Sequence, residues 1–552
     1  METHNQEQTT SSAQQTFQDS RNKMLSGSAW MTAGSIMSRI LGAIYVIPWV
    51  TWFGAYSTQA NALFAKGYNL YSMFLTIATA GIPSAMSKLV GHYNGLDQYI
   101  VSKRVYHAGM YVSAAMGVIC AIIMAFGANI LADGDANVVP VVRSLAWAVL
   151  IIPPMSITRG FLQGYNWMAP SAMSQFIEQL FRVIYMLVAT FLIMKIQKGS
   201  WVVAVTQSTF AAFIGALGAI MVLTYSYMRH SREMKQLERE GNNNRDISSF
   251  DLIVKIIYQS IPFIIVESGI VIYQLIDQYT FNRIMHWFGN YTNYQLNAVY
   301  ALFSFNANKL YMIIISFATA LAVTAIPLLA TARAQRDQES MRRQIENALM
   351  MFYFVMIPAT LGVEAVASQL YTVFYRYDAA GITVLQFATF VSIPMGMYTV
   401  VAAMMQGISE NRRMIKYLFI GVVVKFILQV PCIWLLEGLG PLLATGLSMF
   451  GLNYLVIHSF NMEFGLHFND MAKATNQILA YSLIMFVGVK ALMMLFGLFI
   501  SPYARHAAFF TLVVGVAFGV AIFTYLALRY RLADSILGAP LDSLRQRLHM
   551  HN

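Results

Sequence analysis

Two apolar stretches near the N-terminus decide the fold: SAWMTAGSIMSRILGAIYVIPWVTWF (residues 28–53) and NALFAKGYNLYSMFLTIATAGIPSAMSKL (residues 61–89). A helix needs about 20 apolar residues to cross a bilayer, so each stretch is long enough to span one. Arg39 lies near the middle of the first stretch, where a charge that faces lipid costs at least about 2.5–3.5 kcal/mol. Arg39 is therefore expected to face a cavity or a partner.

The composition indicates an all-α polytopic membrane protein. Hydrophobic residues make up 57% of the 552 residues and charged residues 11%, and the mean hydropathy is +0.55. Soluble domains carry about 25% charged residues, and membrane barrels have strands of only about 10 residues. The sequence shows no metal-binding, nucleotide-binding or nucleophile motif, so we expect neither an enzyme nor a cofactor.

Hydropathy divides the chain into about fourteen transmembrane helices. Residues 1–27 are rich in Gln, Ser and Thr and are expected to form a disordered tail. With that tail in the cytoplasm, the inner segments carry roughly four times as many Lys and Arg residues as the outer segments. Both termini are therefore predicted to be cytoplasmic, and the net charge of +11 follows from this topology without any nucleic acid. The expected spans are 28–53, 61–89, 105–131, 141–163, 171–195, 201–228, 253–281, 296–330, 347–375, 382–408, 415–436, 441–460, 475–500 and 506–530.

The chain also repeats itself at an offset of 239 to 244 residues. Short matches occur in the same order in both halves, and six expected spans separate the members of each pair. An even number of spans preserves direction across the membrane, so the pattern predicts two parallel six-helix lobes around a central cavity, plus two extra C-terminal helices. The matches are Ala62-Leu63-Phe64 with Ala301-Leu302-Phe303, Leu70-Tyr71 with Leu310-Tyr311, Ile82-Pro83 with Ile326-Pro327, Gln163-Gly164 with Gln406-Gly407, and Arg182 with Lys425.

These patterns define the expected domains. The N-lobe covers residues 28–228 and the C-lobe covers residues 253–460, joined by a mixed-charge cytoplasmic linker at 229–252. Residues 461–530 hold the two appended spans, and residues 531–552 form a second cytoplasmic tail. Nothing in the sequence requires an oligomer, so we expect a monomer.

Basic side chains inside the expected spans are candidates for a binding site, because intramembrane charges usually mark a substrate path. Arg39 and Lys309 have no acid one helical turn away and lie too deep to reach the membrane surface, so we expect both to act in function. Lys66 lies near the outer face, where a lysine can extend to the headgroups, so function and anchoring are both open. For Lys490, both a role in function and a contact with the lipid headgroups are possible interpretations.

Two further basic positions have candidate partners. Arg182 lies one turn after Glu178 on the same helix, and this spacing favours an ion pair. Lys425 is the repeat counterpart of Arg182, but Gly421 replaces the acid one turn earlier. Lys425 is therefore expected either to face the cavity or to pair with Glu364 across helices.

The intramembrane cations outnumber the acids, which predicts an anionic cargo. Guanidinium and ammonium groups suit phosphate and pyrophosphate, Arg through bidentate contacts and Lys as a point charge. A cation or drug antiporter would instead present an acidic cavity. The candidate cargo-binding residues are Arg39, Lys66, Arg182, Lys309 and Lys425. The candidate cavity or coupling acids are Glu178, Glu267, Asp277 and Glu364. Asp277 lies near the outer face, so it is expected either to act in function or to anchor the helix at the membrane surface.

Short motifs in three regions carry a family resemblance. Ser38-Arg39-Ile40-Leu41-Gly42 is similar to the first-span motif of MurJ proteins, and Asn308-Lys309-Leu310 stands where those proteins have Asp-Arg-Leu. Leu162-Gln163-Gly164, Pro170-Ser171-Ala172 and residues 177–183 are similar to the Gram-positive branch. The chain thus resembles the MurJ-like lipid II flippases of the multidrug/oligosaccharidyl-lipid/polysaccharide exporter superfamily.

The resemblance assigns a role to only part of the expected site. Enterobacterial MurJ proteins have a second Arg followed by Asp late in the first span, where this chain has Tyr45 and Val46. They also have an Arg pair in the second span, where this chain has only Lys66 nearby. The resemblance therefore assigns a role to two residues only. These are Arg39 and Lys309, where this chain has Lys in place of the family's Arg.

What the resemblance implies is alternating-access transport of lipid II, an undecaprenyl-pyrophosphate-linked glycolipid, from the inner to the outer leaflet of a bacterial cell membrane. The pyrophosphate would dock on the central cations, and residues 461–530 would form a groove for the lipid tail. The partners would be this glycolipid, the bilayer and, as an open point, a coupling ion. The alternatives are a flippase for another undecaprenyl-linked oligosaccharide, such as a capsule, teichoic or exopolysaccharide unit, a cation-coupled drug antiporter, or a scaffold for cell-wall synthases.

Overall fold

The chain folds into helices that form two compact units. The computed structural model describes residues 41–537 except 43, 80, 242–248 and 502, so Arg39 lies outside the described residues. Regular structure within the described ranges is entirely helical, as the composition predicts. Unit 1 comprises the residues up to Trp52 together with Gly67–Ile264, and unit 2 comprises Phe53–Lys66 together with the residues from Ile265 onward.

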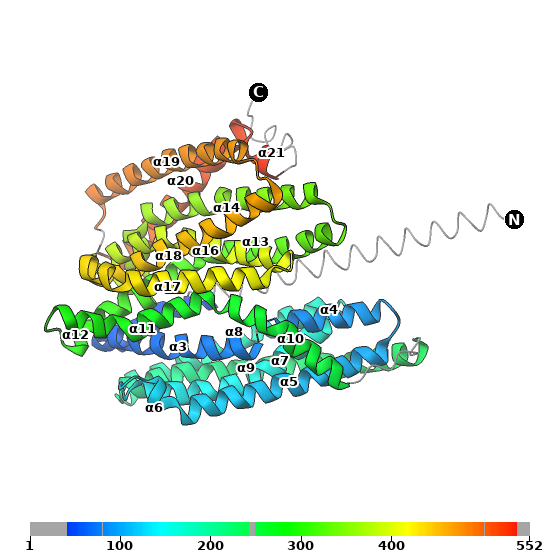
Figure 1. Cartoon of the computed structure of the whole chain (residues 1–552). Coiled ribbons are helices and arrows are strands. Elements are labelled where there is room, and N and C mark those ends of the chain that lie inside the picture. The colour runs from blue at the N-terminus through cyan, green and yellow to red at the C-terminus, as the bar shows by residue number, and fades with distance from the viewer. Residues whose placement is uncertain (1–40, 43, 80, 242–248, 502, 538–552) are drawn as a thin grey trace. The chain divides into compact units, whose positions relative to one another are not determined.

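Unit 1 is built from long helices joined by short turns (Figure 1). Its helices are α2 (Val46–Phe53), the part of α3 (Ser57–Thr79) that follows Lys66, α4 (Ile82–Asn94), α5 (Tyr99–Phe126), α6 (Ala128–Leu131), α7 (Val138–Gly164), α8 (Met168–Phe191) with a π-helical end at Leu192–Ile196, α9 (Trp201–Glu240) and most of α10 (Ser249–Glu267). α7 packs against α4, α5 and α9, and α8 lies along α9. The indole of Trp49 in α2 donates to Ser208 Oγ in α9 at 3.0 Å, which ties α2 to this group.

Unit 2 contains the start of α3 and the rest of the chain. Its other elements are α11 (Gly269–Phe288), α12 (Asn293–Ala301), a π-helical segment (Leu302–Ala307), α13 (Asn308–Ala334), α14 (Gln338–Ala365), α15 (Ala367–Tyr375), α16 (Ala379–Gly407), α17 (Asn411–Leu436), α18 (Gly440–Phe464), α19 (Phe468–Phe499), α20 (Arg505–Arg529) and α21 (Leu532–Leu537). α13 packs against α14 and α16, and α17 pairs with α18 (Figure 1). α19 packs on α14 and α20, which attaches the two appended helices to this unit.

Polar residues in the connections fix where several helices begin. Thr292 and Gln295 form a capping box at the start of α12. Asp337 accepts from the backbone N–H of Ser340 at 3.0 Å, at the start of α14. Such caps satisfy backbone donors that the first helical turn leaves without partners. The polar turns between apolar runs thus set the ends of the helices.

The predicted internal repeat appears as the same turn in both units. Gln163-Gly164 is followed by Asn166 at φ 62°, and Gln406-Gly407 is followed by Ser409 at φ 61°. In each turn the backbone N–H of the positive-φ residue donates to the glutamine carbonyl, at 2.8 Å in unit 1 and 3.0 Å in unit 2. The matching conformations confirm that this sequence match reflects a structural repeat.

The glycine of each turn also makes the equivalent packing contact. A Cβ on Gly164 would lie 2.6 Å from Val90 Cβ in α4, and one on Gly407 would lie 3.1 Å from Leu329 Cβ in α13. The two glycines are 243 residues apart and their neighbours 239, both within the predicted offset. Each unit therefore uses a small residue at the same place to bring two helices together.

The expected seventh span, 253–281, is broken into two helices. α10 ends at Glu267 and α11 begins at Gly269, with a bend of 49° between them. The hydroxyl of Tyr398 in α16 donates to the Val266 carbonyl beside the break. A Cβ on Gly269 would overlap that hydroxyl, so glycine allows the tyrosine to reach the break.

Ten of the described helical segments are long and apolar enough to cross a membrane, or eleven if α10 and α11 form one bent span. One of the ten, Asn411–Phe464, contains both α17 and α18. The first expected span begins before the described residues. The count is compatible with about fourteen spans but does not establish that number.

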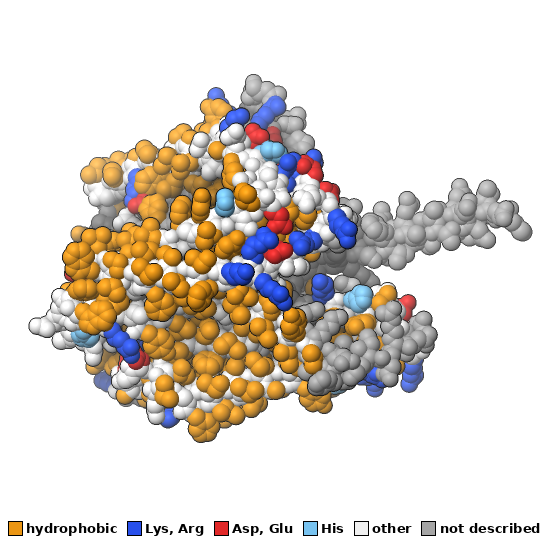
Figure 2. Space-filling model, in the orientation of Figure 1, with side chains coloured by type: hydrophobic (Ala, Val, Ile, Leu, Met, Phe, Trp, Pro, Cys, Tyr) orange, Lys and Arg blue, Asp and Glu red, His pale blue; other side chains and the backbone are white. Residues whose placement is uncertain are grey.

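The exposed surface of the helices is largely apolar. On the face shown in Figure 2, hydrophobic side chains cover most of the helices, whereas charged side chains gather near one end. Phe126, Ile130 and Phe499 are each at least 80% exposed. Exposure of large apolar side chains on this scale requires an apolar surrounding. The chain is therefore a multi-pass membrane protein.

Substituting Gly160 with alanine tests the close packing of α7 on α4. A Cβ at this position would overlap the backbone carbonyl of Pro83, so Gly160→Ala should destabilise the protein by about 1–3 kcal/mol. The measurement is the midpoint of thermal unfolding of the purified protein in detergent. Gly451→Ala in α18 is the control, because a Cβ there meets nothing within 4 Å. Equal midpoints for the two variants would contradict this account.

Candidate functional site

Lys66 is a buried cation with an amide partner. It is 8% exposed, and its Nζ donates to Asn297 Oδ1 at 2.9 Å. The same Nζ lies 5.9 Å from the centre of the Tyr300 ring. The alternative that Lys66 extends to the headgroups is wrong, because its ammonium is enclosed by unit 2.

Lys309 lies between two aromatic rings. It follows the π-helical segment Leu302–Ala307, and segments of this kind are frequent at functional sites. Its Nζ lies 5.5 Å from the centre of the Phe64 ring and 5.6 Å from that of Phe305. A cation–π contact is worth about 0.5–2 kcal/mol. These two rings help to position the ammonium.

A buried chain of hydrogen bonds runs beside these lysines. Asn61 Nδ2 donates to Asn306 Oδ1 at 2.7 Å, and Asn306 Nδ2 donates to Tyr371 Oη at 2.8 Å. This chain is not predicted from the positions of the charged residues, because its members are uncharged. The available signal was the presence of two asparagines within otherwise apolar stretches, where an amide needs a partner.

In unit 1, Glu178 binds two arginines. The predicted pair is confirmed, with Arg182 Nη2 3.2 Å from Glu178 Oε1. Arg159 Nη2 lies 2.8 Å from the other carboxylate oxygen, and Arg159 Nε donates to Ser174 Oγ at 2.8 Å. From the sequence, Arg159 was expected only as a charge on the inner side of the membrane. The three charged side chains form a cluster with one net positive charge.

Lys425 is enclosed completely within unit 2. It is 0% exposed, and its Nζ donates to Asp277 Oδ1 at 2.6 Å, to the Pro441 carbonyl at 2.8 Å and to Thr445 Oγ1 at 2.7 Å. Gln429 Nε2 donates to the same Asp277 oxygen at 2.9 Å. An ammonium has three donors and no acceptor, so all of its hydrogen-bonding capacity is used.

The predictions for Lys425 and Asp277 need correction. Lys425 neither faces a cavity nor pairs with Glu364, because α11 supplies the carboxylate that binds it. Asp277 is 8% exposed and does not reach the headgroups. A buried charge needs such a partner, since taking an unpaired ion out of water costs several kcal/mol. The pair therefore belongs to the framework of unit 2.

Glu364 has a different partner from the predicted one. Lys490 Nζ lies 3.3 Å from Glu364 Oε1, and Gln386 Nε2 donates to the same oxygen at 3.1 Å. The expectation that Lys490 either acts in function or contacts headgroups missed this ion pair. It joins α19, an appended helix, to α14.

Glu267 differs from the other three candidate acids. It is the last residue of α10, beside the break before α11, and its side chain is exposed. Within the described ranges it forms no ion pair or hydrogen bond through its carboxylate. It is thus the one candidate acid for which the described part of the chain supplies no cation.

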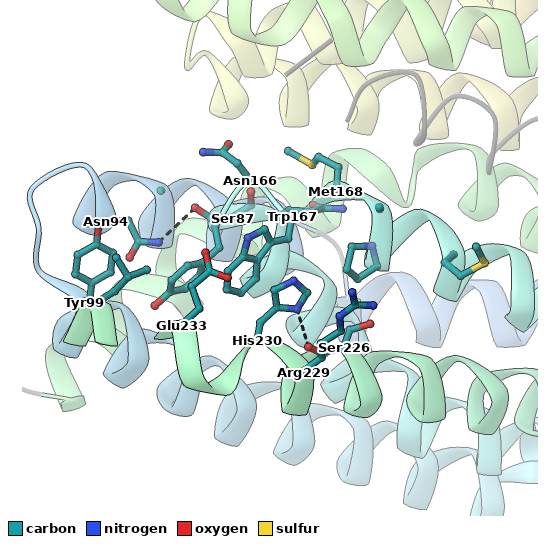
Figure 3. Close-up of a pocket in the computed structure, with 18 of the residues that line it drawn as sticks. Ser87, Asn94, Tyr99, Asn166, Trp167, Met168, Ser226, Arg229, His230 and Glu233 are labelled. Atoms are coloured by element: carbon teal, nitrogen blue, oxygen red, sulfur yellow. Dashed lines mark hydrogen bonds between the residues drawn. The ribbon is translucent and has the colours of Figure 1, made fainter. Parts of the chain in front are cut away.

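A cavity of about 1370 Å³ opens at the end of unit 1 where α4, the α7–α8 turn and α9 meet (Figure 3). Trp167 lies between two rings in its wall. Its ring centre is 4.9 Å from that of Tyr165 and 4.2 Å from that of His230, with nearly parallel planes. His230 Nδ1 bonds to the Ser226 carbonyl at 2.8 Å, which fixes the imidazole. This cavity was not among the sites predicted from the sequence. The feature of the sequence that could have indicated it is the pair of aromatic residues, Tyr165 and Trp167, in the repeated turn.

None of these clusters is suited to a metal ion. Among the described residues, no three His, Cys, Asp or Glu side chains are placed to bind one. Several of the charged groups are instead paired with each other, in helices of membrane-spanning length. This arrangement defines the chain as a polytopic membrane protein whose charged groups lie within its helical units.

Two solved structures show which class of fold this is. The chain is similar to lipid II flippase MurJ in an inward closed conformation, with a TM-score of 0.60 and 13% identity over 91% of this chain and 98% of that chain. It is also similar to an outward-facing multidrug resistance MATE family transporter of the MOP superfamily, with a TM-score of 0.59 and 14% identity over 80% of this chain and 95% of that chain. The chain therefore shares the helical fold of these two proteins.

Sequence comparison gives the family. The model of the polysaccharide biosynthesis protein family matches residues 24–333. The chain is 34% identical to lipid II flippase MurJ of Bacillus subtilis (strain 168) over 535 residues, which cover 94% of this chain and 97% of the relative. It is 21% identical over 505 residues to the uncharacterized membrane protein YabM of the same organism, with 91% of this chain and 92% of the relative covered. The chain belongs to the polysaccharide biosynthesis protein family, among its MurJ-type transporters, and is not an enzyme.

A pair of variants tests the structural role of Lys425. Asp277→Ala leaves the ammonium buried without its carboxylate and should cost about 3–5 kcal/mol of stability. Asp277→Ala combined with Lys425→Met removes both charges and should recover most of that loss. The measurements are the midpoint of thermal unfolding in detergent and the amount of protein in the membrane. If the double variant is no more stable than the single one, the ion pair does not have this role.

Proposed function

We propose that the chain is a flippase that moves lipid II from the inner to the outer leaflet by alternating access. The observation that carries this proposal is the 34% identity to lipid II flippase MurJ of Bacillus subtilis over 94% of the chain. The likeness to transporters of the MOP superfamily supports a transport mechanism. The excess of basic over acidic groups inside the spans supports an anionic cargo.

The proposed pyrophosphate ligands are Arg39, Lys66 and Lys309, and in unit 1 also Arg182. Arg39 is included among these ligands because of its sequence motif alone. Arg182 is included because its cluster with Glu178 and Arg159 keeps one net positive charge. Lys425 is not part of the proposed site, because its three donors are already bound within unit 2.

The proposal includes a location and an arrangement in the membrane. The chain lies in the bacterial cell membrane as a monomer, with both termini in the cytoplasm. The lobes at 28–228 and 253–460 move the cargo, and residues 229–252 link them. Residues 461–530 form a groove for the lipid tail, supported by the exposed apolar side chains of Leu498 and Phe499 in α19.

Complementation tests the function directly. The chain is expressed in a bacterium depleted of its own lipid II flippase, and survival and the accessibility of lipid II at the outer leaflet are measured. Rescue supports the proposal. Failure, with the protein folded and inserted, would favour another undecaprenyl-linked oligosaccharide. The description of the matching family as polysaccharide biosynthesis proteins is the reason to keep this second candidate.

Lys309 provides the sharpest test of the proposed site. Removing a charge-assisted hydrogen bond costs about 1.5–3 kcal/mol, which corresponds to a loss of about ten- to hundredfold. Lys309→Ala should therefore reduce outward transport of lipid II by about that factor, whereas Lys309→Arg should keep most of it. Lys473→Ala is the control, because the Lys473 side chain is 80% exposed. Wild-type transport by Lys309→Ala at matched expression would rule out this ligand.

Glu267 is the proposed site for a coupling ion. The carboxylates of Glu178, Asp277 and Glu364 are bound by cations of the chain itself. Glu267 lies in the middle of the expected span 253–281, where an ionised carboxylate without a cation is costly, so uptake of a proton or a monovalent cation would be favourable. Its place beside the α10–α11 break would link ion binding to bending of this span.

Measurement in proteoliposomes under an imposed proton or sodium gradient tests this role. The transport rate of the wild-type protein should depend on one of the two gradients. Glu267→Gln should transport at a rate that responds to neither gradient. Asp470→Asn is the control, because its side chain is 79% exposed at the start of α19. The role is excluded if Glu267→Gln keeps the full gradient dependence.

A further inference from the structure

Arg143 is a basic residue of unit 1 that the proposed function does not use. It is the third residue of the expected span 141–163, at the end that the charge pattern predicts to be outer. The positive-inside rule does not account for a cation at this end. Arg143 Nε donates to the Ala125 carbonyl at 3.3 Å, and no acid among the described residues forms an ion pair with this arginine. The two terminal nitrogens of the guanidinium are therefore available to an anion.

Arg143 lines a cavity of about 570 Å³ that α6, α7 and α9 form within unit 1 (Figure 1). This volume lies in the range of roughly 300–1,000 Å³ that is usual for small-molecule sites. Asn129 and Gln207 also line the cavity. The acids of the turn before α7, Asp133 and Asp135, are not among the described residues on its wall. The described wall thus carries one positive charge and no carboxylate, which favours an anionic ligand.

Gln207 adds a second donor to this cavity. The hydroxyl of Tyr185 donates to Gln207 Oε1 at 2.7 Å, which holds the amide group in place. Gln207 is partly exposed, and its Nε2 has no hydrogen-bond partner among the described residues. An amide nitrogen can only donate. Arg143 and Gln207 therefore present N–H donors from two helices, which suit a ligand with phosphate or ester oxygens.

An apolar strip continues from the cavity into the expected spans. Trp147 lies one turn further along α7 than the arginine, about 6 Å along the helix axis, and its side chain is 55% exposed. Its ring centre is 6.1 Å from that of Phe213, and the Phe213 ring is 5.2 Å from that of Phe210 on the cavity wall. Leu217 and Met221 follow at helical spacing on α9, and both are exposed. Because tryptophan is enriched at membrane–water interfaces, this strip matches a lipid whose head lies at the arginine.

We infer that this cavity binds an anionic phospholipid of the outer leaflet. Arg143 pairs with the lipid phosphate, Gln207 donates to an ester oxygen, and an acyl chain lies along the exposed strip that begins at Trp147. A free phosphate would use the arginine alone and would leave the apolar strip without a partner. The ligand is a lipid of the surrounding membrane, so this site is distinct from the proposed cargo ligands and does not depend on the proposed function.

Quenching of Trp147 fluorescence by brominated lipids tests the site. The purified full chain is reconstituted in phosphatidylcholine vesicles, in which a rising fraction of the lipid is replaced by brominated phosphatidylglycerol. A parallel series uses brominated phosphatidylcholine. Subtracting the signal of a Trp147→Phe protein isolates the fluorescence of Trp147. Both leaflets have the same composition, so the result does not depend on the orientation of the protein.

The wild-type protein should bind phosphatidylglycerol about tenfold more tightly than phosphatidylcholine beside Trp147, which is the effect of one charge-assisted hydrogen bond. Arg143→Gln should lower this ratio to about one, because it removes the charge. Arg143→Lys should keep most of the preference. Adding inorganic phosphate at constant ionic strength should leave the quenching unchanged.

Lys195→Gln is the matched control. Lys195 is an exposed cation at the same predicted outer end of unit 1, but it is not among the described residues that line the cavity. This variant should keep the wild-type ratio. The inference is overturned if the wild-type ratio is close to one, if Arg143→Gln keeps the tenfold preference, or if Lys195→Gln lowers it equally. Reversal of the quenching by inorganic phosphate would also overturn it, because the occupant would then be a free anion.

Discussion

Pairing of charges inside each unit is the interaction on which the rest of the structure depends. A lone charge inside a bilayer-spanning helix is costly, and removing one partner of a buried pair exposes that cost. Lys425 and Asp277 meet this requirement between α17 and α11, and Glu364 and Lys490 meet it between α14 and α19. These pairs also fasten helices to each other. In unit 2, the charges that look like cargo ligands in the sequence thus serve partly to hold the helices in place.

The two units share local geometry but not the placement of their charges. The turn after Gln163-Gly164 and the turn after Gln406-Gly407 have the same conformation and the same close helix contact. Arg182 and Lys425 occupy equivalent positions in the repeat, yet Arg182 pairs with an acid on its own helix and Lys425 with an acid on another helix. Backbone packing of the repeat therefore leaves each unit free to differ in its polar interior.

The sequence predicts the elements well because hydropathy and short-range spacing act locally. The Glu178–Arg182 pair could be predicted since an (i, i+4) spacing brings two side chains together on any helix. The Asp277–Lys425 contact could not, because its members are 148 residues apart and meet only through the packing of α11 on α17. Arg159 was missed for the same reason.

Uncharged polar features were also not predicted from the sequence. The hydrogen-bonded chain through Asn306 and the cavity beside Trp167 depend on amides and aromatic rings. These groups are uncharged, so the positions of intramembrane charges do not indicate them. The broken helix at Glu267 was also missed, because the hydropathy of the segment continues through the break. Predictions that rest on charge and hydropathy therefore find the spans and the candidate cations, but not the polar surfaces between helices.

The neutral pairs have an electrical consequence. Moving one elementary charge through a membrane potential of 100 mV involves about 2.3 kcal/mol. The Asp277–Lys425 and Glu364–Lys490 pairs carry no net charge when both members are ionised, so two paired helices that move together through the field do no net electrical work on account of the pair. The cluster of Glu178 with its two arginines keeps one positive charge and is not neutral in this sense. The voltage sensitivity of such a protein is therefore concentrated in its few unbalanced charges and in whatever charge the cargo brings.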